Sequence, residues 1–362
     1  RRSGHPSHPG GVLENVDQII RARWILPVNP RDTVLEHHAV ALRDGRIVAV
    51  VPADRVAGAY RAPLDTALDD HLLMPGLVNT HGHADKTLLR GLADDHTLMD
   101  WLQGHIWPAE ARWVGEDFVR TGTRLAMAEM LASGTTCASD MYFFPDVAAE
   151  TVVEAGFRAQ IAFPIFEHPS AWGANADEYL AKGLQVRDDY RSCPRLSSAS
   201  GPHAPYTTSD QTLARVAMLA AELDSAVHMH VHETAGEIRD AIAQHGCRPL
   251  ARLEGLGLLS PRFQAVHMTQ VAPEDLELLV RNQIQVLHCP GSNLKLAAGF
   301  CPVRTLGEAG INVALGTDGA ASNNALDLFA EMRLAALLAK GSSGDPTALS
   351  AHAAVRMATL GG

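Results

Sequence analysis

Two histidines separated by a single residue, His81 and His83, have a type and spacing that suit metal binding. They follow an apolar run at residues 76–80 that has the character of a strand. Side chains at positions i and i+2 of a strand point to the same side, so the two imidazoles can reach one point in space. Imidazole nitrogen is a common ligand of zinc and similar divalent metals. Because an isolated pair of this kind is more often two solvated loop residues, the interpretation depends on further ligands.

Further histidines and one aspartate stand at the ends of other predicted strands. They are His203 in GPH, His228, His230 and His232 in VHMHVHE, His267 in AVHMTQ, His288 in LHCPGS and Asp318 in GTDG. Taken alone, each is more simply explained as a packed or solvated polar side chain. Chance would have scattered such residues over helices and loops as well. Their placement at strand ends therefore predicts a metal centre.

The alternation of His228, His230 and His232 allows all three to face the interior of a barrel. His228 lies deepest and His232 lies nearest the loop, which favours His230 as the ligand. No lysine ends the fourth strand, where a carbamylated lysine could bridge two metals. The sequence therefore favours a single metal with water completing its shell, bound by His81, His83, His230 and Asp318.

An alternation of strands and helices, typical of a (β/α)₈ TIM barrel, runs through residues 75–362. The predicted strands are residues 76–80, 135–139, 158–163, 196–200, 226–230, 264–267, 285–289 and 312–316. Helical stretches with apolar stripes separate them. Such a barrel takes about 250 residues and carries its active groups at the carboxyl ends of its strands. A doubly wound open sheet is the alternative, but no GxGxxG follows the first strand. Asp345-Pro346 predicts the start of the last helix.

The segment before the barrel, residues 12–74, predicts a small β domain. Its short β-rich pieces are separated by turns, and Asp44-Gly45 between alternating apolar residues predicts a hairpin. The first residues, 1–11, are rich in Gly, Pro and Ser and predict a disordered lead-in. The fold class is therefore α/β, a TIM barrel preceded by a small β-sandwich domain.

Composition limits the classes of partner. The chain has 362 residues, of which 46% are hydrophobic, and a formal net charge of −11, which argues against nucleic acid or an anionic membrane. No apolar run approaches the ~20 residues of a membrane span. Five widely spaced cysteines, without a CxxC pair, suggest reduced thiols in a cytoplasmic protein. The expected partner is a small-molecule substrate, and a homo-oligomer is left open.

Several longer strings resemble the amidohydrolase superfamily. They are PGLVNTHGHADKTLLRGLADD, WLQGHIWPAE, GPHAPY, HVHETAGE, HCPGSNLKLAAGFCPV and LGTDGAASNN. Within the superfamily they are most similar to the 5′-methylthioadenosine/S-adenosylhomocysteine deaminases of the adenosine deaminase and chlorohydrolase branch. The resemblance implies one zinc ion per subunit, with Fe²⁺ as the alternative metal. It implies hydrolytic conversion of the 6-amino group of an adenine nucleoside thioether to the inosine analogue, with release of ammonia.

The resemblance also implies residue roles. Asp318 would be both metal ligand and proton acceptor, beside the three histidine ligands. Glu110 and His203 would hold the substrate, with Glu110 toward the ribose hydroxyls. Glu233 would contact the reacting purine edge, and His267 would sit beside the attacking hydroxide. A separate expectation from charge is that Arg158, in GFRAQ, reaches a carboxylate tail of the substrate.

Alternatives remain at this point. The same metal set suits a triazine chlorohydrolase, or a guanine, cytosine or pterin deaminase, and a non-catalytic scaffold relative is a remoter reading. The pair Asp85-Lys86 departs from the family pattern and either alters what the pocket accepts or is a solvated ion pair. The residues of SNLKL, Ser292, Asn293 and Lys295, either shape the pocket or cap a turn. Relatives continue for several tens of residues, so we expect an incomplete β domain with an exposed sheet edge.

Overall fold

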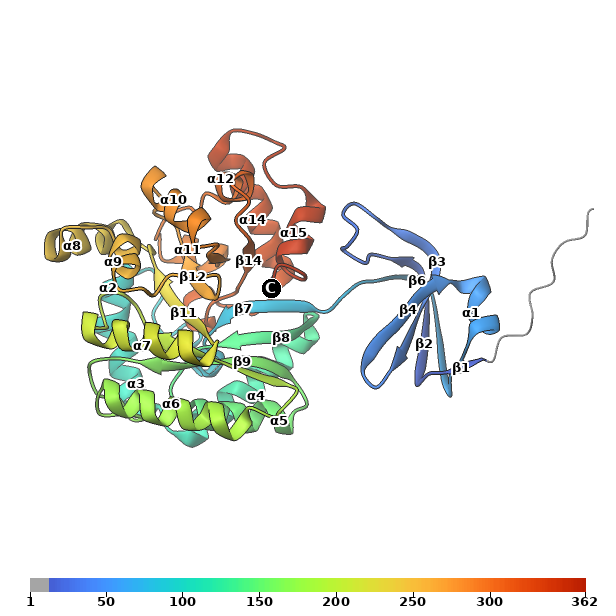
Figure 1. Cartoon of the computed structure of the whole chain (residues 1–362), viewed down its shortest axis with the longest axis horizontal. Coiled ribbons are helices and arrows are strands. Elements are labelled where there is room, and N and C mark those ends of the chain that lie inside the picture. The colour runs from blue at the N-terminus through green and yellow to red at the C-terminus, as the bar shows by residue number, and fades with distance from the viewer. Residues whose placement is uncertain (1–12) are drawn as a thin grey trace, which may run out of the picture. The chain divides into compact units, whose positions relative to one another are not determined.

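The computed structural model describes residues 13–362, and the predicted lead-in at residues 1–11 lies outside the described part. The chain divides into two compact units between Pro75 and Gly76 (Figure 1). No helix of the described residues is long and apolar enough to cross a bilayer.

Eight parallel strands form the sheet of the second unit, and their order in the sheet follows their order in the chain. They are β7 (Leu77–Gly82), β8 (Thr135–Asp140), β9 (Arg158–Ile165), β10 (Leu196–Pro202), β11 (Ala226–Val231), β12 (Phe263–His267), β13 (Gln285–His288) and β14 (Val313–Leu315). The first and last strands meet where the Thr80 hydroxyl donates to the carbonyl oxygen of Leu315, 2.8 Å away. The backbone N–H of Asp318 donates to the carbonyl oxygen of His81 at 3.0 Å. The sheet is thus a barrel, and the predicted fold class is confirmed.

Helices follow the strands and cover the outside of the barrel (Figure 1). They are α4 (Glu116–Ala132), α5 (Pro145–Glu154), α6 (Ala176–Tyr190), α7 (Asp210–Leu223), α8 (Ala235–His245), α9 (Pro249–Gly255), α10 (Pro273–Arg281), α11 (Pro290–Lys295), α12 (Val303–Glu308), α13 (Ala320–Asn323), α14 (Leu328–Ser343) and α15 (Ala351–Met357). The last helix begins later than predicted. Its N-cap is Ser350, whose side chain accepts from the backbone N–H of Ala353, whereas Asp345 accepts from the N–H of Thr347 in a turn.

A long connection between β7 and β8 supplies one wall of the site. It contains a 3₁₀ turn, η1 (Ala84–Leu89), then α2 (Leu98–Trp101), a π-helical turn, η2 (Leu102–Ile106), and α3 (Trp107–Trp113). Apolar side chains pack this segment against the barrel, among them Leu89, Trp101, Leu102, Ile106, Leu296 and Ala321. The polar residues of the same segment can therefore be held in fixed positions over the carboxyl end of the barrel.

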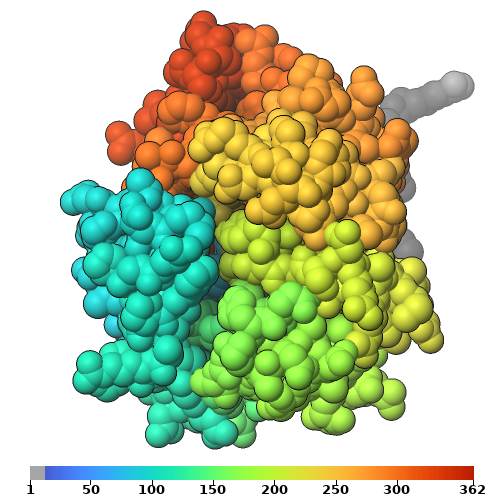
Figure 2. Space-filling model, turned by 90° about the vertical axis from the view of Figure 1, so that its left-hand side faces the viewer, coloured from blue at the N-terminus to red at the C-terminus, as the bar shows by residue number. Residues whose placement is uncertain are grey.

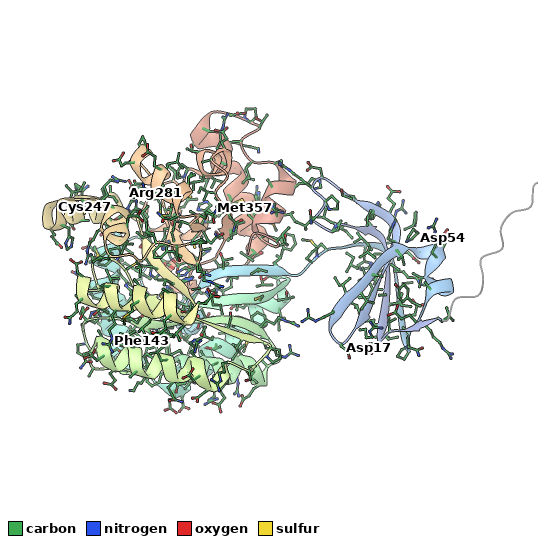
Figure 3. The ribbon with its side chains drawn as sticks, viewed as in Figure 1. Asp17, Asp54, Phe143, Cys247, Arg281 and Met357 are labelled. Atoms are coloured by element: carbon green, nitrogen blue, oxygen red, sulfur yellow. The ribbon has the colours of Figure 1, made fainter. Side chains whose placement is uncertain are left out.

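The first unit is built on a four-stranded sheet with the order β4-β3-β2-β6. Its strands are β2 (Gln18–Ile25), β3 (Leu35–Arg43), β4 (Arg46–Pro52) and β6 (Leu64–Leu73). The unit also contains the helix α1 (Ala53–Ala59) and a short parallel pair of strands, β1 (Glu14–Asn15) and β5 (Tyr60–Arg61). Asp44 and Gly45 have φ of 51° and 70°, so the predicted hairpin connects β3 and β4. The carboxylate of Asp17, labelled in Figure 3, accepts from the backbone N–H of Asp44.

Candidate metal centre and active site

Three histidines and one aspartate from distant parts of the chain meet at the carboxyl end of the barrel. His81 lies in β7, His83 precedes η1, His230 lies in β11 and Asp318 follows β14. All four are buried, with at most 7% of the residue exposed. They come together because parallel strands of a closed barrel end at the same rim.

The atoms that face one another are the ones that bind metal. Nε2 of His81 lies 3.1 Å from Nε2 of His230. Nε2 of His81 and Nε2 of His83 lie 3.5 and 3.4 Å from Oδ1 of Asp318. Ligands at about 2.1 Å from a tetrahedral zinc ion are about 3.4 Å apart, so this spacing matches a shared metal. The donor set of imidazoles and a carboxylate fits zinc.

Backbone carbonyls fix the orientation of two of these rings. Nδ1–H of His83 donates to the carbonyl oxygen of Met141 at 2.5 Å, and Nδ1–H of His230 donates to that of His203 at 2.8 Å. With the proton on Nδ1, the lone pair of each ring is on Nε2 and points to the shared site. Such outer partners set the tautomer and direction of a metal-ligating histidine.

The third ring, His81, is fixed by a chain of buried side chains that crosses the barrel. Its Nδ1 lies 2.8 Å from Nε2 of His228, and Nδ1 of His228 lies 2.7 Å from Oε1 of Gln264. Gln160 Nε2 donates to the same oxygen at 2.8 Å. An amide oxygen can only accept, so His228 carries its proton on Nδ1 and accepts from His81 through Nε2. This leaves the lone pair of His81 on the nitrogen that faces the other ligands.

Burial sets the charge of the cluster. It lowers the pKa of His81, and lowers the pKa of His83 and of His230 well below the usual histidine value. The rings are therefore neutral, which metal binding requires. Burial alone would raise the pKa of Asp318, but the hydrogen bond with His81 and the electrostatic interactions with the His83 and His81 rings hold it well below its usual value. Asp318 is a carboxylate among neutral imidazoles.

Asp318 is held in place from both sides. Its Oδ2 accepts from the Ser292 hydroxyl at 2.6 Å, and its Oδ1 accepts from the backbone N–H of Gly319 at 2.7 Å. Its φ of 61° lies in the left-handed region, which the Gly-flanked loop accommodates. Ser292 therefore belongs to the site, in agreement with one of the two readings of the SNLKL string.

A second pair of polar residues lies beside the ligands. Nε2 of His267 is 3.6 Å from Oε1 of Glu233, and Nδ1 of His267 is 2.9 Å from Oδ1 of Asn293. The ring of His267 stacks near that of His230, with centroids 5.5 Å apart. Burial raises the pKa of Glu233. The pair offers a proton carrier and a hydrogen-bonding imidazole next to the metal site.

A cavity of about 1060 Å³ reaches this cluster at His83 and is also lined by Glu110, Tyr142, Phe143, Phe166 and His203, among others. Figure 2 shows a hollow between the α2–α3 segment and the green and yellow segments that face it. Phe143, labelled in Figure 3, follows β8. Phe166 stacks on the ring of His203, with centroids 4.7 Å apart and planes at 28°. Planar aromatic walls above a metal site suit a flat heterocyclic ligand.

A model of the amidohydrolase family matches residues 72–362. The chain belongs to the amidohydrolase family. The predicted resemblance is confirmed, and with it the prediction of a hydrolase.

Curated relatives and solved structures of similar amidohydrolases cover most of the chain. A 5-methylthioadenosine/S-adenosylhomocysteine deaminase of Saccharophagus degradans is 54% identical over 344 residues, which are 95% of this chain and 77% of that protein. One of Teredinibacter turnerae is 52% identical over 96% of this chain and 78% of its own length. The crystal structure of an adenosine deaminase from Xanthomonas campestris with bound zinc superposes with a TM-score of 0.95 at 50% identity. That match covers 97% of this chain and 80% of that one.

The structure brings together most residues expected in the amidohydrolase site. Side-chain atoms that could bind a metal form two groups that share His81: one with His83 and Asp318, and one with His230 and His267. Glu110 and His203 lie on the cavity wall. His232 does not face the metal cluster: its Nδ1 bonds the carbonyl oxygen of Gln270, and its Nε2 accepts from the backbone N–H of Leu250.

Arg158 is not part of this site. It is the first residue of β9 and pairs in register with Cys137, so it lies at the amino end of the barrel. Arg158 does not line the active-site cavity. It lines a different cavity, together with Arg195 and Gly361. The expectation that Arg158 reaches the substrate was wrong. It rested on the charge of Arg158 alone, whereas the first residue of a barrel strand lies at the end opposite the site.

Three side chains were missed at the sequence level. Tyr142, just after β8, donates through its hydroxyl to Oε1 of Glu110 at 2.8 Å. Its place after a strand end was a signal that could have identified it. Gln264 and Gln160 lie in the interior of strands and gave no such signal. Lys295, in contrast, bonds Asn324 and the carbonyl oxygen of Ala321 and lies outside the cavity wall.

Proposed function

We propose that this amidohydrolase is a zinc-dependent deaminase of adenine nucleoside thioethers. It would convert the 6-amino group of 5′-methylthioadenosine or S-adenosylhomocysteine to the inosine analogue and release ammonia. The observation that carries the proposal is the convergence of His81, His83, His230 and Asp318 beneath a large cavity, with Glu233 and His267 beside them. Relatives that are 54% and 52% identical bear the name of this activity, which supports the choice of substrate.

The ligand set fits one zinc ion, held by His81, His83, His230 and Asp318. A zinc ion held there would lower the pKa of a water to ~7 and so would make hydroxide available at neutral pH. Asp318 would accept the proton of the attacking water: its Oδ1 faces His81 and His83, and its Oδ2 accepts from the Ser292 hydroxyl. The same carboxyl group can then return the proton to the departing nitrogen.

Glu233 and His267 act on the ring and on the nucleophile. Attack at C6 of adenine drives electrons onto a ring nitrogen, which needs a proton. Glu233, whose pKa is raised by burial, can supply it. His267, held through Nδ1 by Asn293, directs Nε2 toward the reacting region and can stabilise charge as the bond forms.

The substrate would lie in the cavity with its base toward the metal cluster. His203, neutral because burial lowers its pKa to about 3, can hydrogen-bond the heterocycle while Phe166 stacks behind its ring. Glu110 is positioned by Tyr142 to accept from sugar hydroxyls. The cavity volume of about 1060 Å³ leaves space for a substituent at the 5′ position.

An ammonia-release screen tests the proposal. Metal-replete protein is assayed with adenosine, 5′-methylthioadenosine, S-adenosylhomocysteine, guanine, cytosine and a chlorotriazine, with chloride release measured for the last. We expect ammonia from the adenine nucleosides, with the highest kcat/KM for a thioether. Preferential turnover of guanine, cytosine or the triazine would overturn the assignment of substrate. No turnover of any compound by protein with stoichiometric zinc would overturn the proposed enzyme function.

A further inference from the structure

Lys86 is a buried cation in the wall of the substrate cavity. Its side chain is 10% exposed, and its Nζ lies 3.3 Å from Oε1 of Glu110, whose side chain is also 10% exposed. The alternative of a solvated Asp85–Lys86 pair was wrong. Asp85 is fully buried, and neither of its carboxylate oxygens has a hydrogen-bond partner among the described residues.

Two aromatic rings hold the ammonium group. Nζ of Lys86 lies 5.3 Å from the ring centroid of Tyr142 and 5.9 Å from that of Trp101, distances at which a cation is attracted to a ring face. Tyr142 also donates its hydroxyl to Oε1 of Glu110. Lys86 and Tyr142 therefore both contact one oxygen of the carboxylate, Oε1, and fix its plane.

A buried ion pair of this kind costs free energy, because both charges are removed from water. Lys86 and Glu110 both line the substrate cavity rather than the core, so the pair faces the ligand. A carboxylate can only accept hydrogen bonds and an ammonium group can only donate them. Each hydroxyl of a vicinal diol does both. The pair is thus the chemical complement of a diol.

We propose that Lys86 is a specificity-determining residue that, with Glu110, recognises the 2′,3′-diol of a ribonucleoside. Oε2 of Glu110 accepts from the hydroxyls, and Nζ of Lys86 donates to the oxygen of one of them. This inference rests on the proposed function, since it requires a nucleoside in the cavity. Lys86 adds a cation to the sugar site. The Lys86–Glu110 pair thereby selects ribonucleosides over nucleosides that lack the diol.

The test compares Lys86→Met with the wild type on adenosine and on 2′,3′-dideoxyadenosine. For each compound kcat/KM is measured or, where turnover is absent, the inhibition constant. We expect Lys86→Met to lower kcat/KM for adenosine about tenfold or more, mainly through KM, because a hydrogen bond to a charged group is lost. The value for the dideoxy compound should change less than about threefold, since it makes no such bond.

Controls separate this role from a structural one. Lys340→Met removes a lysine on α14 whose ammonium group donates to the carbonyl oxygen of Leu349, outside the cavity wall, and should leave both substrates unaffected. Lys86→Arg should restore part of the discrimination, and zinc content should stay at one per chain in all variants. An equal fall for both nucleosides, or no fall for adenosine, would overturn the role of Lys86 alone. Absence of ammonia release by the wild type from any adenine nucleoside would overturn the proposed function and this inference with it.

Discussion

The two ends of the barrel carry polar residues of similar kinds but use them differently. At the amino end, Arg195 donates to the carbonyl oxygen of Gly156 and Asn312 to that of Gly361, so these side chains fasten loops. At the carboxyl end, His83 and His230 also donate to backbone carbonyls, but each has a second nitrogen that faces the shared site. A side chain with two opposed functional atoms can be anchored and reactive at once. The residues suited to chemistry therefore lie at the carboxyl end of the barrel, and these polar side chains at the amino end only hold loops in place.

The largest effect should come from the carboxyl end itself. Asp318→Asn removes the proposed charged metal ligand and proton acceptor together, so kcat/KM for 5′-methylthioadenosine should fall by about 10³ or more. Zinc content, measured by mass spectrometry of the metal, should fall as well. Asp240→Asn, at an exposed position of α8, is the matched control and should behave as the wild type. Near-normal turnover by Asp318→Asn would contradict the assigned role.

Glu233→Gln should cost less, because it removes a proton carrier and leaves the ligands intact. We expect kcat to fall by about 10²–10⁴ while one zinc per chain remains bound. Glu308→Gln, at an exposed position of α12 in an ion pair with Arg304, is the control. If turnover of the purine survives within a few-fold with zinc retained, the proton passes through another group.

Gln264→Leu should weaken metal binding without touching a ligand. It removes the acceptor that fixes His228, and through His228 the tautomer of His81, so the dissociation constant for zinc should rise about 10–100-fold. Competition with a chromogenic chelator measures it. Gln285→Leu on the neighbouring strand is the control, since Gln285 contacts the carbonyl oxygen of Pro261 at the amino end. An equal effect of both variants would mean that general packing, and not the chain to His81, is responsible.

The smallest effect should come from the amino end. Arg158→Ala should change kcat/KM for S-adenosylhomocysteine by less than about twofold, because surface changes away from a site usually have small effects. A KM that rises tenfold for this substrate and not for adenosine would place Arg158 at the substrate tail and contradict the separation of the two ends.

The strands were predictable because each is a short apolar run in a regular alternation with helices, as for residues 135–139, found as Thr135–Asp140. The candidate metal ligands were predictable because His83 directly follows β7 and Asp318 comes three residues after the end of β14. Arg158 was misassigned because β9 is eight residues long, which separates its ends by about 23 Å. The role of Gln264 was not predictable, since it depends on the register that sets Gln264 opposite His228 on the neighbouring strand and on the contact of His228 with His81 across the barrel.

Lys86 shows a further limit of sequence-based prediction. Its charge suggested solvent, and only the packing of α2 and α3 over the rim puts it beside Glu110. That segment contains a π-helical turn at Leu102–Ile106, which shifts the side chains that follow relative to a regular helix. The position of Glu110 thus depends on an irregularity that helical periodicity does not predict.

The most direct test of the metal-centre assignment is a crystal structure of zinc-reconstituted protein, with anomalous differences collected on both sides of the zinc absorption edge. We predict one anomalous peak per chain, within about 2.3 Å of Nε2 of His81, His83 and His230 and of a carboxylate oxygen of Asp318. A peak elsewhere, or full zinc loading with these four side chains unligated, would contradict the assignment.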